Sequence, residues 1–261
     1  MQVMNRYFIQ LAYDGTAYHG WQRQPNAVTV QELIENALTQ YTGKPVWLTG
    51  QGRTDTGVHA SEFFAHWDTE EDLHALLRGP VEDGIRVLNR MLPNDLVIQR
   101  VFQVPETAHA RFSALFRTYQ YRVHWAKDPF RARYSWQIPA CPDWDSVLKA
   151  AALLPGNRDY GCFARAGGGQ QHDLCNLTHA QWKLNADQSA VFEIRANRFL
   201  RNMVRAIVGT LMEVGRGYRS YDQINDLLNE GTRSDAGATA PAHGLCLVHV
   251  EYPDGIIQPN P

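Results

Sequence analysis

Cysteine is scarce in this sequence of 261 residues, and the chemistry that depends on it is not expected. The four cysteines, at positions 141, 162, 175 and 246, form no C-x-x-C pair, which argues against a disulfide scaffold and a cysteine zinc site. Ten histidines are present, yet none has ligand-like spacing to a cysteine or carboxylate. The phosphate loop and the Rossmann glycine pattern are also missing. We therefore predict no metal and no cofactor.

Long apolar runs are absent as well. No stretch of about 18 uncharged apolar residues occurs, so a membrane helix is not predicted. The first residues, MQVMNRYFIQL, lack the basic start, apolar middle and cleavage site of a signal peptide. We therefore expect a cytoplasmic protein without membrane contacts. Hydrophobic residues make up 44% of the chain, enough to bury a substantial core.

Lysine is rare among the basic residues. Of the 25 basic side chains 21 are arginine, while the net charge is only -2. That balance alone argues mildly against a nucleic-acid partner. Arginine forks nevertheless match phosphate geometry and stack on planar bases, so the bias suits RNA or buried ion pairs. Compositional drift explains the same bias equally well.

Hydrophobic periodicity predicts an alternation of strands and helices. In the first part we expect strands over 6–13, 44–49, 61–68 and 95–104, helices over 30–41, 70–78 and 82–91, and a polar loop over 50–58. Thr29 and Glu32 have the spacing of a capping box in front of the 30–41 helix. Further on we expect a strand over 116–125, helices over 145–154, 200–214 and 221–229, a hairpin over 180–196 and a strand over 245–252. The glycine-rich stretch 165–171 is expected to be a mobile loop.

This element order indicates an α+β protein of two related lobes. A boundary between Val104 and Pro105 separates an N-terminal lobe, 1–104, from a C-terminal lobe, 105–261. No residue-level repeat proves a duplication.

The loop GRTDTGVHA, 52–60, has the strongest chemical signal. Asp55 lies between glycines that permit tight turns and close ligand approach. Arg53, two residues earlier, stabilises a carboxylate charge of the kind that a nucleophile or general base needs. Asp55 as the cap of a turn is the alternative reading of the same residues.

Basic residues and aromatics mix in two other stretches. The segment 111–133 has six basic residues against the single acid Asp128, interleaved with Phe112, Phe116, Tyr119, Tyr121 and Trp125, which is typical of an RNA-binding face. Half of these aromatics fit a core equally well. Arg198, Arg201 and Arg205 have the spacing of one basic stripe on a helix, suited to phosphates.

The 52–60 loop closely resembles the catalytic loop G-R-T-D-A-G-V-H-A of the TruA family of tRNA pseudouridine synthases, with Thr56 in place of the usual Ala. Four further stretches resemble the family in chain order: 13–24, 109–121, 202–209 and 240–245. The similarity therefore extends over nearly the whole chain. It implies two ferredoxin-like lobes whose sheets join into a continuous antiparallel surface, with helices on one side and the active-site cleft between the lobes.

The resemblance also implies roles for five residues. Asp55 is the catalytic aspartate, and Arg205 pairs with it across the cleft. Tyr119 stacks on the target uracil, Arg53 holds the nucleotide out of its stack, and Leu245 lines the uracil pocket. From the residues alone, a tyrosine on a strand such as Tyr119 is more often a core or cross-strand aromatic, and an arginine on an amphipathic helix such as Arg205 is usually a solvated or helix-terminal charge.

The implied activity is the conversion of uridine to pseudouridine at positions 38, 39 and 40 of the tRNA anticodon stem-loop, by a homodimer. A carboxylate assists by attack at C6 of the base, by attack at C1′ of the ribose, or by removal of a ribose proton. Two alternatives remain: an RNA-binding module with an idle carboxylate, and a hydrolase that pairs Asp55 with a histidine.

Overall fold

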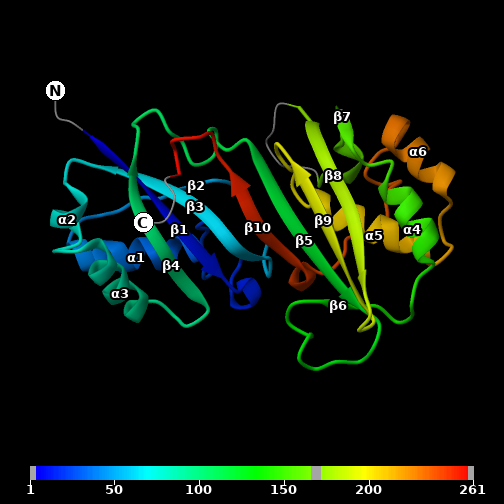
Figure 1. Cartoon of the computed structure of the whole chain (residues 1–261), viewed down its shortest axis with the longest axis horizontal. Helices are drawn as coiled ribbons and strands as arrows, with labels where there is room; N and C mark the ends of the chain where they lie inside the picture. The colour runs from blue at the N-terminus through cyan, green and yellow to red at the C-terminus, as the bar shows by residue number, and fades with distance from the viewer. Residues whose placement is uncertain (1–3, 166–171, 258–261) are drawn as a thin grey trace. The chain divides into compact units, whose positions relative to one another are not determined.

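The computed structural model describes residues 4–165 and 172–257, which form two compact units (Figure 1). Unit 1 contains the residues up to Leu115 and those from Leu247 onward, and unit 2 contains Phe116–Cys246. The last strand thus belongs mainly to unit 1, although it is distant from that unit in sequence. The functional division of the chain at residue 104 stays a prediction, and the expected mobile loop at 165–171, with Gly167–Gly169, lies almost wholly outside the described residues.

Unit 1 is built on an antiparallel sheet with the strand order β4-β1-β3-β2. Its elements are β1 (Asn5–Tyr13), α1 (Val30–Thr42), β2 (Thr49–Gly50), β3 (His59–Thr69), α2 (Leu73–Leu76), α3 (Val81–Met91) and β4 (Leu96–Val104). Strand–helix–strand–strand–helix–strand with the fourth strand beside the first is the ferredoxin-like arrangement. Phe8, Leu11 and Phe63 are among its fully buried side chains.

Unit 2 repeats this arrangement with the strand order β10-β5-β9-β8, extended by β7 beside β8. Its elements are β5 (Phe116–His124), β6 (Trp136–Gln137), α4 (Trp144–Ala151), β7 (Gly156–Asp159), β8 (Leu174–Asn185), β9 (Ser189–Ala196), α5 (Met203–Gly215), α6 (Tyr221–Glu230) and the start of β10 (Leu245–Glu251). Helices α4, α5 and α6 lie together beside β8 in Figure 1. The predicted α+β class, with ferredoxin-like units of mainly antiparallel strands, is confirmed.

Two local predictions are wrong. The stretch 44–49 is not a strand apart from Thr49, because the Val46 and Leu48 amides donate to Thr39 and Glu35 of α1, at 3.1 and 2.9 Å, instead of to a neighbouring strand. The capping box is also missing, since the Thr29 hydroxyl is buried without a hydrogen-bond partner. Among the described residues, no helix is long and apolar enough to cross a membrane.

A buried histidine fixes the chain that follows β4. Nδ1 of His66, on β3, accepts a hydrogen bond of 3.2 Å from the Ala110 amide. The ring of His109 meets the His66 ring edge-on, with centroids 4.6 Å apart. Burial, aided by the charge of Arg6, lowers the pKa of His66 to about 4. Both the hydrogen bond and the burial therefore require the neutral ring.

We expect this histidine to make folding sensitive to acid. Between its ordinary pKa and about 4, the unfolded chain binds a proton at residue 66 that the folded chain does not, so stability falls as the pH falls through this window. His66→Asn keeps an acceptor but does not titrate. Urea unfolding at about pH 7.5 and about pH 5 should show that the parent loses about 2 kcal/mol more than the variant. Equal losses would contradict a neutral buried His66.

Candidate active site

The Asp55 loop is a tight turn with fixed backbone. The Val58 amide donates to the Asp55 carbonyl oxygen at 3.1 Å, and Gly57 adopts a φ of 78°, which favours glycine. Before the turn, the buried Thr54 hydroxyl lies 2.9 Å from the Tyr13 hydroxyl of β1. After it, His59 begins β3, and its Nδ1 accepts from the Gly15 amide at 3.0 Å. The carboxylate of Asp55 is therefore presented from a backbone held at both ends.

A second loop, 14–24, packs directly against this turn. The Trp21 amide donates to the Thr54 carbonyl at 3.4 Å, and the Gly57 amide donates to the Tyr18 carbonyl at 3.2 Å. Gly20 has a φ of 86°, and a Cβ built on it would lie 2.3 Å from the Thr54 carbonyl oxygen. A Cβ on Gly15 would lie 2.1 Å from the Val58 carbonyl oxygen. Side chains are therefore excluded at these two positions by the Asp55 turn itself.

The 14–24 loop is anchored in turn to the core of unit 1. The Trp21 indole stacks on Phe63 of β3, with centroids 4.2 Å apart and planes at 29°. Arg23 donates to the buried Glu35 carboxylate of α1 at 3.2 Å. The family-like stretch 13–24 thus has a clear structural role, which the sequence did not reveal: it supports the Asp55 turn.

Arg53 and Asp55 differ in exposure, although they share this loop. Arg53 is exposed to solvent, whereas Asp55 is half-buried. A half-buried carboxylate with an exposed guanidinium two residues earlier on the same loop fits a site that binds a phosphate-bearing substrate at its rim. The roles of both residues stay predictions.

Tyr119 lies on β5 of unit 2, opposite Ile194 of β9. It is half-buried, and its ring meets that of Phe199 at a right angle with centroids 5.2 Å apart. The next residue on the same face of the strand, Tyr121, is fully buried and donates its hydroxyl to the Pro241 carbonyl at 2.8 Å. Tyr119 therefore lies where the core of unit 2 gives way to its surface.

Arg205 lies in the first turn of α5 and is bound to a segment distant in sequence. Its Nε donates to the Ala240 carbonyl at 2.8 Å, and the Ala240 amide donates back to the Arg205 carbonyl at 3.1 Å. Asn202 reaches the same segment, because its amide nitrogen donates to the Thr239 hydroxyl at 2.8 Å. A Cβ on Gly209 would lie 1.7 Å from the Ala238 carbonyl oxygen, so the helix and the segment pack backbone to backbone.

The predicted basic stripe on this helix is wrong. Helix α5 begins at Met203, so Arg198 and Arg201 precede it. The physical reason is Asn202, which adopts a left-handed φ of 67° and breaks the helical path before Met203. Of the three arginines, Arg205 alone is helical.

Leu245 is the first residue of β10 and is buried. The glycine before it, Gly244, lies so close to the Tyr121 ring that a Cβ would come within 2.7 Å of it. The stretch 240–245 is therefore fixed by α5 at one end and by β5 at the other. Unit 2 thus carries Tyr119, Arg205 and Leu245 on adjoining elements, and unit 1 carries Arg53 and Asp55 on one loop.

The aromatic and basic segment 111–133 divides into core and surface. Tyr121 is fully buried, whereas Phe112 is 76% exposed and has the Arg111 guanidinium 5.5 Å from its ring centroid. Phe116 is half-buried under the guanidinium of Arg195, at 4.0 Å from the ring centroid. The segment therefore combines core aromatics with surface arginine–aromatic pairs.

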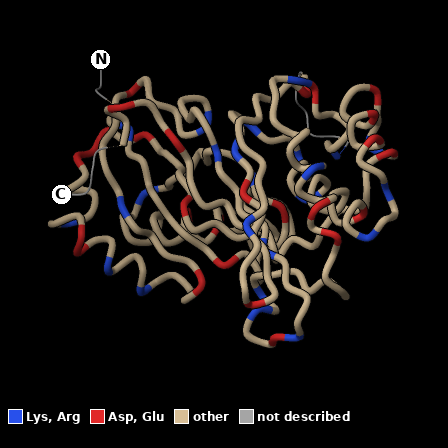
Figure 2. Tube along the Cα trace, turned by 45° about the vertical axis from the view of Figure 1, so that its right-hand side comes forward, with Lys and Arg blue, Asp and Glu red and all other residues tan. Residues whose placement is uncertain are grey.

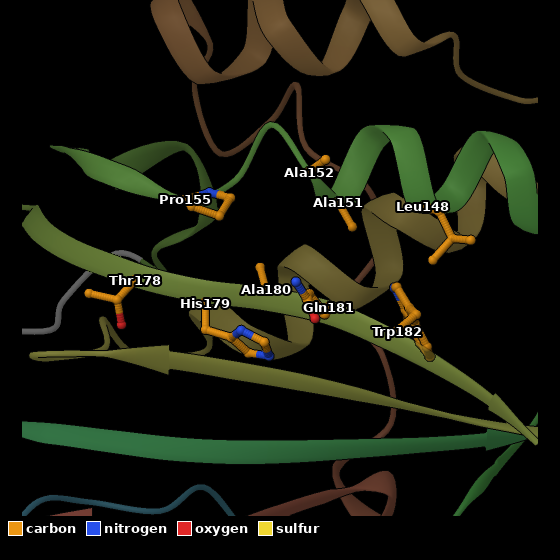
Figure 3. A pocket seen from close by; sticks show the side chains of 9 residues that line it. All are labelled: Leu148, Ala151, Ala152, Pro155, Thr178, His179, Ala180, Gln181 and Trp182. Carbon is orange, nitrogen blue, oxygen red and sulfur yellow. The ribbon is translucent and has the colours of Figure 1, made fainter.

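A shallow groove of about 390 Å³ lies elsewhere on unit 2, between α4 and β8 (Figure 3). It is lined by Leu148, Ala151, Ala152, Pro155, Thr178, His179, Ala180, Gln181 and Trp182. None of the five predicted site residues is among these. In the described part of the chain, no group of three or more histidine, cysteine or carboxylate side chains is arranged to hold a metal.

Charges of both signs are interspersed over each unit, as Figure 2 shows. This agrees with a formal net charge of only -2. An anionic partner would therefore be recognised by particular arginines and not by a strongly basic field over a whole unit.

Comparison with known proteins connects these features. The family model described as tRNA pseudouridine synthase matches residues 10–113 and 150–253. The tRNA pseudouridine synthase A of Bacteroides thetaiotaomicron is 46% identical over 255 residues, which cover 97% of this chain and 93% of the relative. Its namesake from Syntrophotalea carbinolica is 38% identical over 244 residues, covering 93% of this chain and 94% of that protein.

The first matched segment contains the Asp55 turn together with the 14–24 loop that supports it, and the second contains Arg205 and its partner segment. The family model matches two long segments of the chain. The relatives are 38% and 46% identical over nearly their full length, so a single assignment follows. The chain belongs to the tRNA pseudouridine synthase family.

Proposed function

We propose that this protein converts uridine to pseudouridine at positions 38, 39 and 40 of the tRNA anticodon stem-loop, with Asp55 as the catalytic carboxylate. As a member of its family it is a pseudouridine synthase, an isomerase that acts on tRNA. The observation that carries the residue-level proposal is the Asp55 turn, whose backbone is held by Gly15, Gly20 and Trp21. Such fixation keeps a reacting group within the narrow range of geometry that catalysis needs.

The reaction sets the demands on the site. The N1–C1′ bond of uridine breaks, the uracil turns while it stays bound, and a C5–C1′ bond forms. C5 loses its proton and N1 gains one, so no atom is lost and no oxidant or reductant is consumed. A site for this chemistry must hold a free base away from water through the rotation. Asp55 acts at C6, at C1′ or on a ribose proton, and each route requires its ionised form.

The other predicted residues complete this site in the proposal. Tyr119 stacks on the uracil and keeps it in place, Leu245 lines the pocket, and Arg205 pairs with Asp55. The hydrogen bond from Nε of Arg205 to the Ala240 carbonyl supports this role, because it restrains the guanidinium group of the arginine. Arg53 is exposed at the rim and holds the target nucleotide out of its stack, as extrusion of a base requires.

The tRNA-bound form is a homodimer in the cytoplasm in this proposal, as the resemblance to the TruA family implies. Two subunits then contact one tRNA. Affinity comes mainly from contacts between arginines and phosphates, so it depends on salt.

Removal of the carboxylate tests the proposal directly. Asp55→Asn keeps the size of the side chain but removes its charge, so we expect single-turnover pseudouridine formation to fall by at least about 10³-fold. Binding of tRNA should persist, because phosphate contacts are unchanged. The measurement is release of tritium from tRNA labelled at uracil C5, paired with filter binding. Turnover close to that of the parent would refute the role of Asp55, and release of free uracil would indicate a hydrolase.

The support of the turn is tested by two glycines of similar backbone conformation. Gly20 and Gly43 both have positive φ, but a Cβ on Gly43 would meet nothing within 4 Å. Both alanine variants should lose about 1 kcal/mol of stability from backbone strain, and Gly20→Ala should lose about 1 to 3 kcal/mol more, because its Cβ overlaps the Thr54 carbonyl oxygen. Gly20→Ala alone should also displace the Asp55 turn and lower the single-turnover rate by about 10- to 100-fold. Equal rates in the two variants would show that the contact with Thr54 does not matter for catalysis.

Arg205 is tested at the chemical step. Arg205→Ala should lower the single-turnover rate at saturating protein by about 100-fold, while tRNA affinity changes only a few-fold. Arg205→Lys keeps the charge but loses the Nε donor, so it should restore only part of the rate. A rate equal to the parent's in Arg205→Ala would exclude Arg205 as a partner of the reaction.

A further inference from the structure

The turn that follows β4 in unit 1 is fixed more firmly than a surface connection needs. Nε and Nη2 of Arg6 each donate to the Asp68 carboxylate at 2.7 Å, and Nη1 donates to the carbonyls of Glu106 and Ala108 at 2.9 and 2.8 Å. The buried Ala110 donates to His66, and its carbonyl accepts from the Tyr252 hydroxyl at 2.6 Å. The base of the turn is thus tied to the sheet.

The tip of the turn is organised by the His109 ring. Nδ1 of His109 accepts from the Arg111 amide at 3.1 Å and from the Phe112 amide at 3.3 Å. Ser113 closes the turn, because its hydroxyl accepts from the His109 amide and its amide donates to the His109 carbonyl, both at 2.9 Å. A ring nitrogen with two amide donors must be unprotonated. Burial lowers the pKa of His109, as do the charges of Arg6 and Arg111, so the ring is neutral at neutral pH.

This turn presents an aromatic ring to solvent. Phe112 is 76% exposed, yet its orientation is restricted by the His109 ring, with centroids 4.4 Å apart, and by the guanidinium of Arg111. Burial of such a ring would contribute about 1.5 to 3 kcal/mol of hydrophobic free energy, and this gain is not made while the ring is exposed to solvent. A restrained aromatic beside an arginine is the arrangement on which an unpaired nucleobase stacks while its phosphate is bound.

We propose that Arg111 and Phe112 form a second RNA contact of unit 1, in which Phe112 stacks on an unpaired nucleobase of the tRNA and Arg111 binds a neighbouring phosphate. The inference rests on the proposed function, since it takes tRNA as the ligand. The contacted nucleotide is not the target. The Asp55 turn leads into His59 at the start of β3, and His66 lies about 23 Å further along that strand at 3.3 Å per residue. The contact therefore contributes to affinity and not to the chemical step.

Binding of unmodified tRNA to the full-length protein tests this contact. Phe112→Ala should raise the Kd about tenfold, within the range that loss of one stacked base costs. Phe112→Leu stays apolar but does not stack and should behave like the alanine variant, whereas Phe112→Trp should remain within about threefold of the parent. Single-turnover rates at saturating protein should equal that of the parent. Arg111→Gln should lower the salt dependence of binding by about one phosphate contact.

Tyr218→Ala is the matched control, because Tyr218 is 79% exposed in the turn after α5 of unit 2 and lies outside the 111–133 segment. It should bind tRNA as the parent does. The proposal is overturned if Phe112→Ala binds tRNA within about twofold of the parent, or if Phe112→Leu retains the parent's affinity, which would indicate a general apolar contact. Thermal unfolding of each variant should match the parent, since the ring is mostly exposed. Pseudouridine formation by the parent, measured in parallel, reports separately on the proposed function.

Discussion

Close backbone packing between the Asp55 turn and the 14–24 loop is the constraint on which the rest of unit 1 depends. Gly15 and Gly20 have no room for a Cβ, because carbonyl oxygens of the turn occupy that space. Interlocking backbones tolerate little adjustment, since hydrogen bonds and hard contacts act together. The surrounding core anchors the 14–24 loop, because Trp21 stacks on Phe63 and Arg23 donates a hydrogen bond to the buried Glu35. The backbone of Asp55 is therefore positioned as firmly as that of a residue on a strand, although Asp55 lies on a loop.

Unit 2 uses the same principle with different elements. Helix α5 lies against the backbone of residues 238–240, an approach that Gly209 permits, and Arg205 is restrained by its bond to the Ala240 carbonyl. The same stretch continues to Pro241, which accepts from Tyr121, and to Gly244 beneath the Tyr121 ring. Three residues predicted to act on one substrate are thus carried by a single packed assembly of α5, β5 and the start of β10. The repeated ferredoxin-like order provides both units with a rigid sheet behind these loops.

The proposed RNA contact at Phe112 shows how the fold separates binding from chemistry. The Asp55 turn lies at one end of β3, and the His66–His109 pair lies near the other. One strand therefore sets the spacing between a reactive group and a stacking surface. Because β3 is a paired inner strand, this spacing does not vary with loop motion. Because the net charge is only -2, individual contacts at fixed positions contribute more to RNA recognition than a general positive field.

Periodicity and turn chemistry determined most elements: strand 6–13, the helix that ends at Gly43, the hairpin near Asp187 and the helix that ends at Gly215 match the structure within a few residues. The resemblance supplied the five candidate residues. Tertiary structure decided the rest, because those outcomes depend on partners distant in sequence. Glu35 and Thr39 accept the amides that would otherwise pair in a strand before Thr49. Asn202 breaks the helical path between Arg201 and Arg205. The Thr54 carbonyl leaves room only for glycine at position 20. No local pattern encodes such contacts, since each is fixed by the space and the hydrogen-bonding groups that a remote segment leaves.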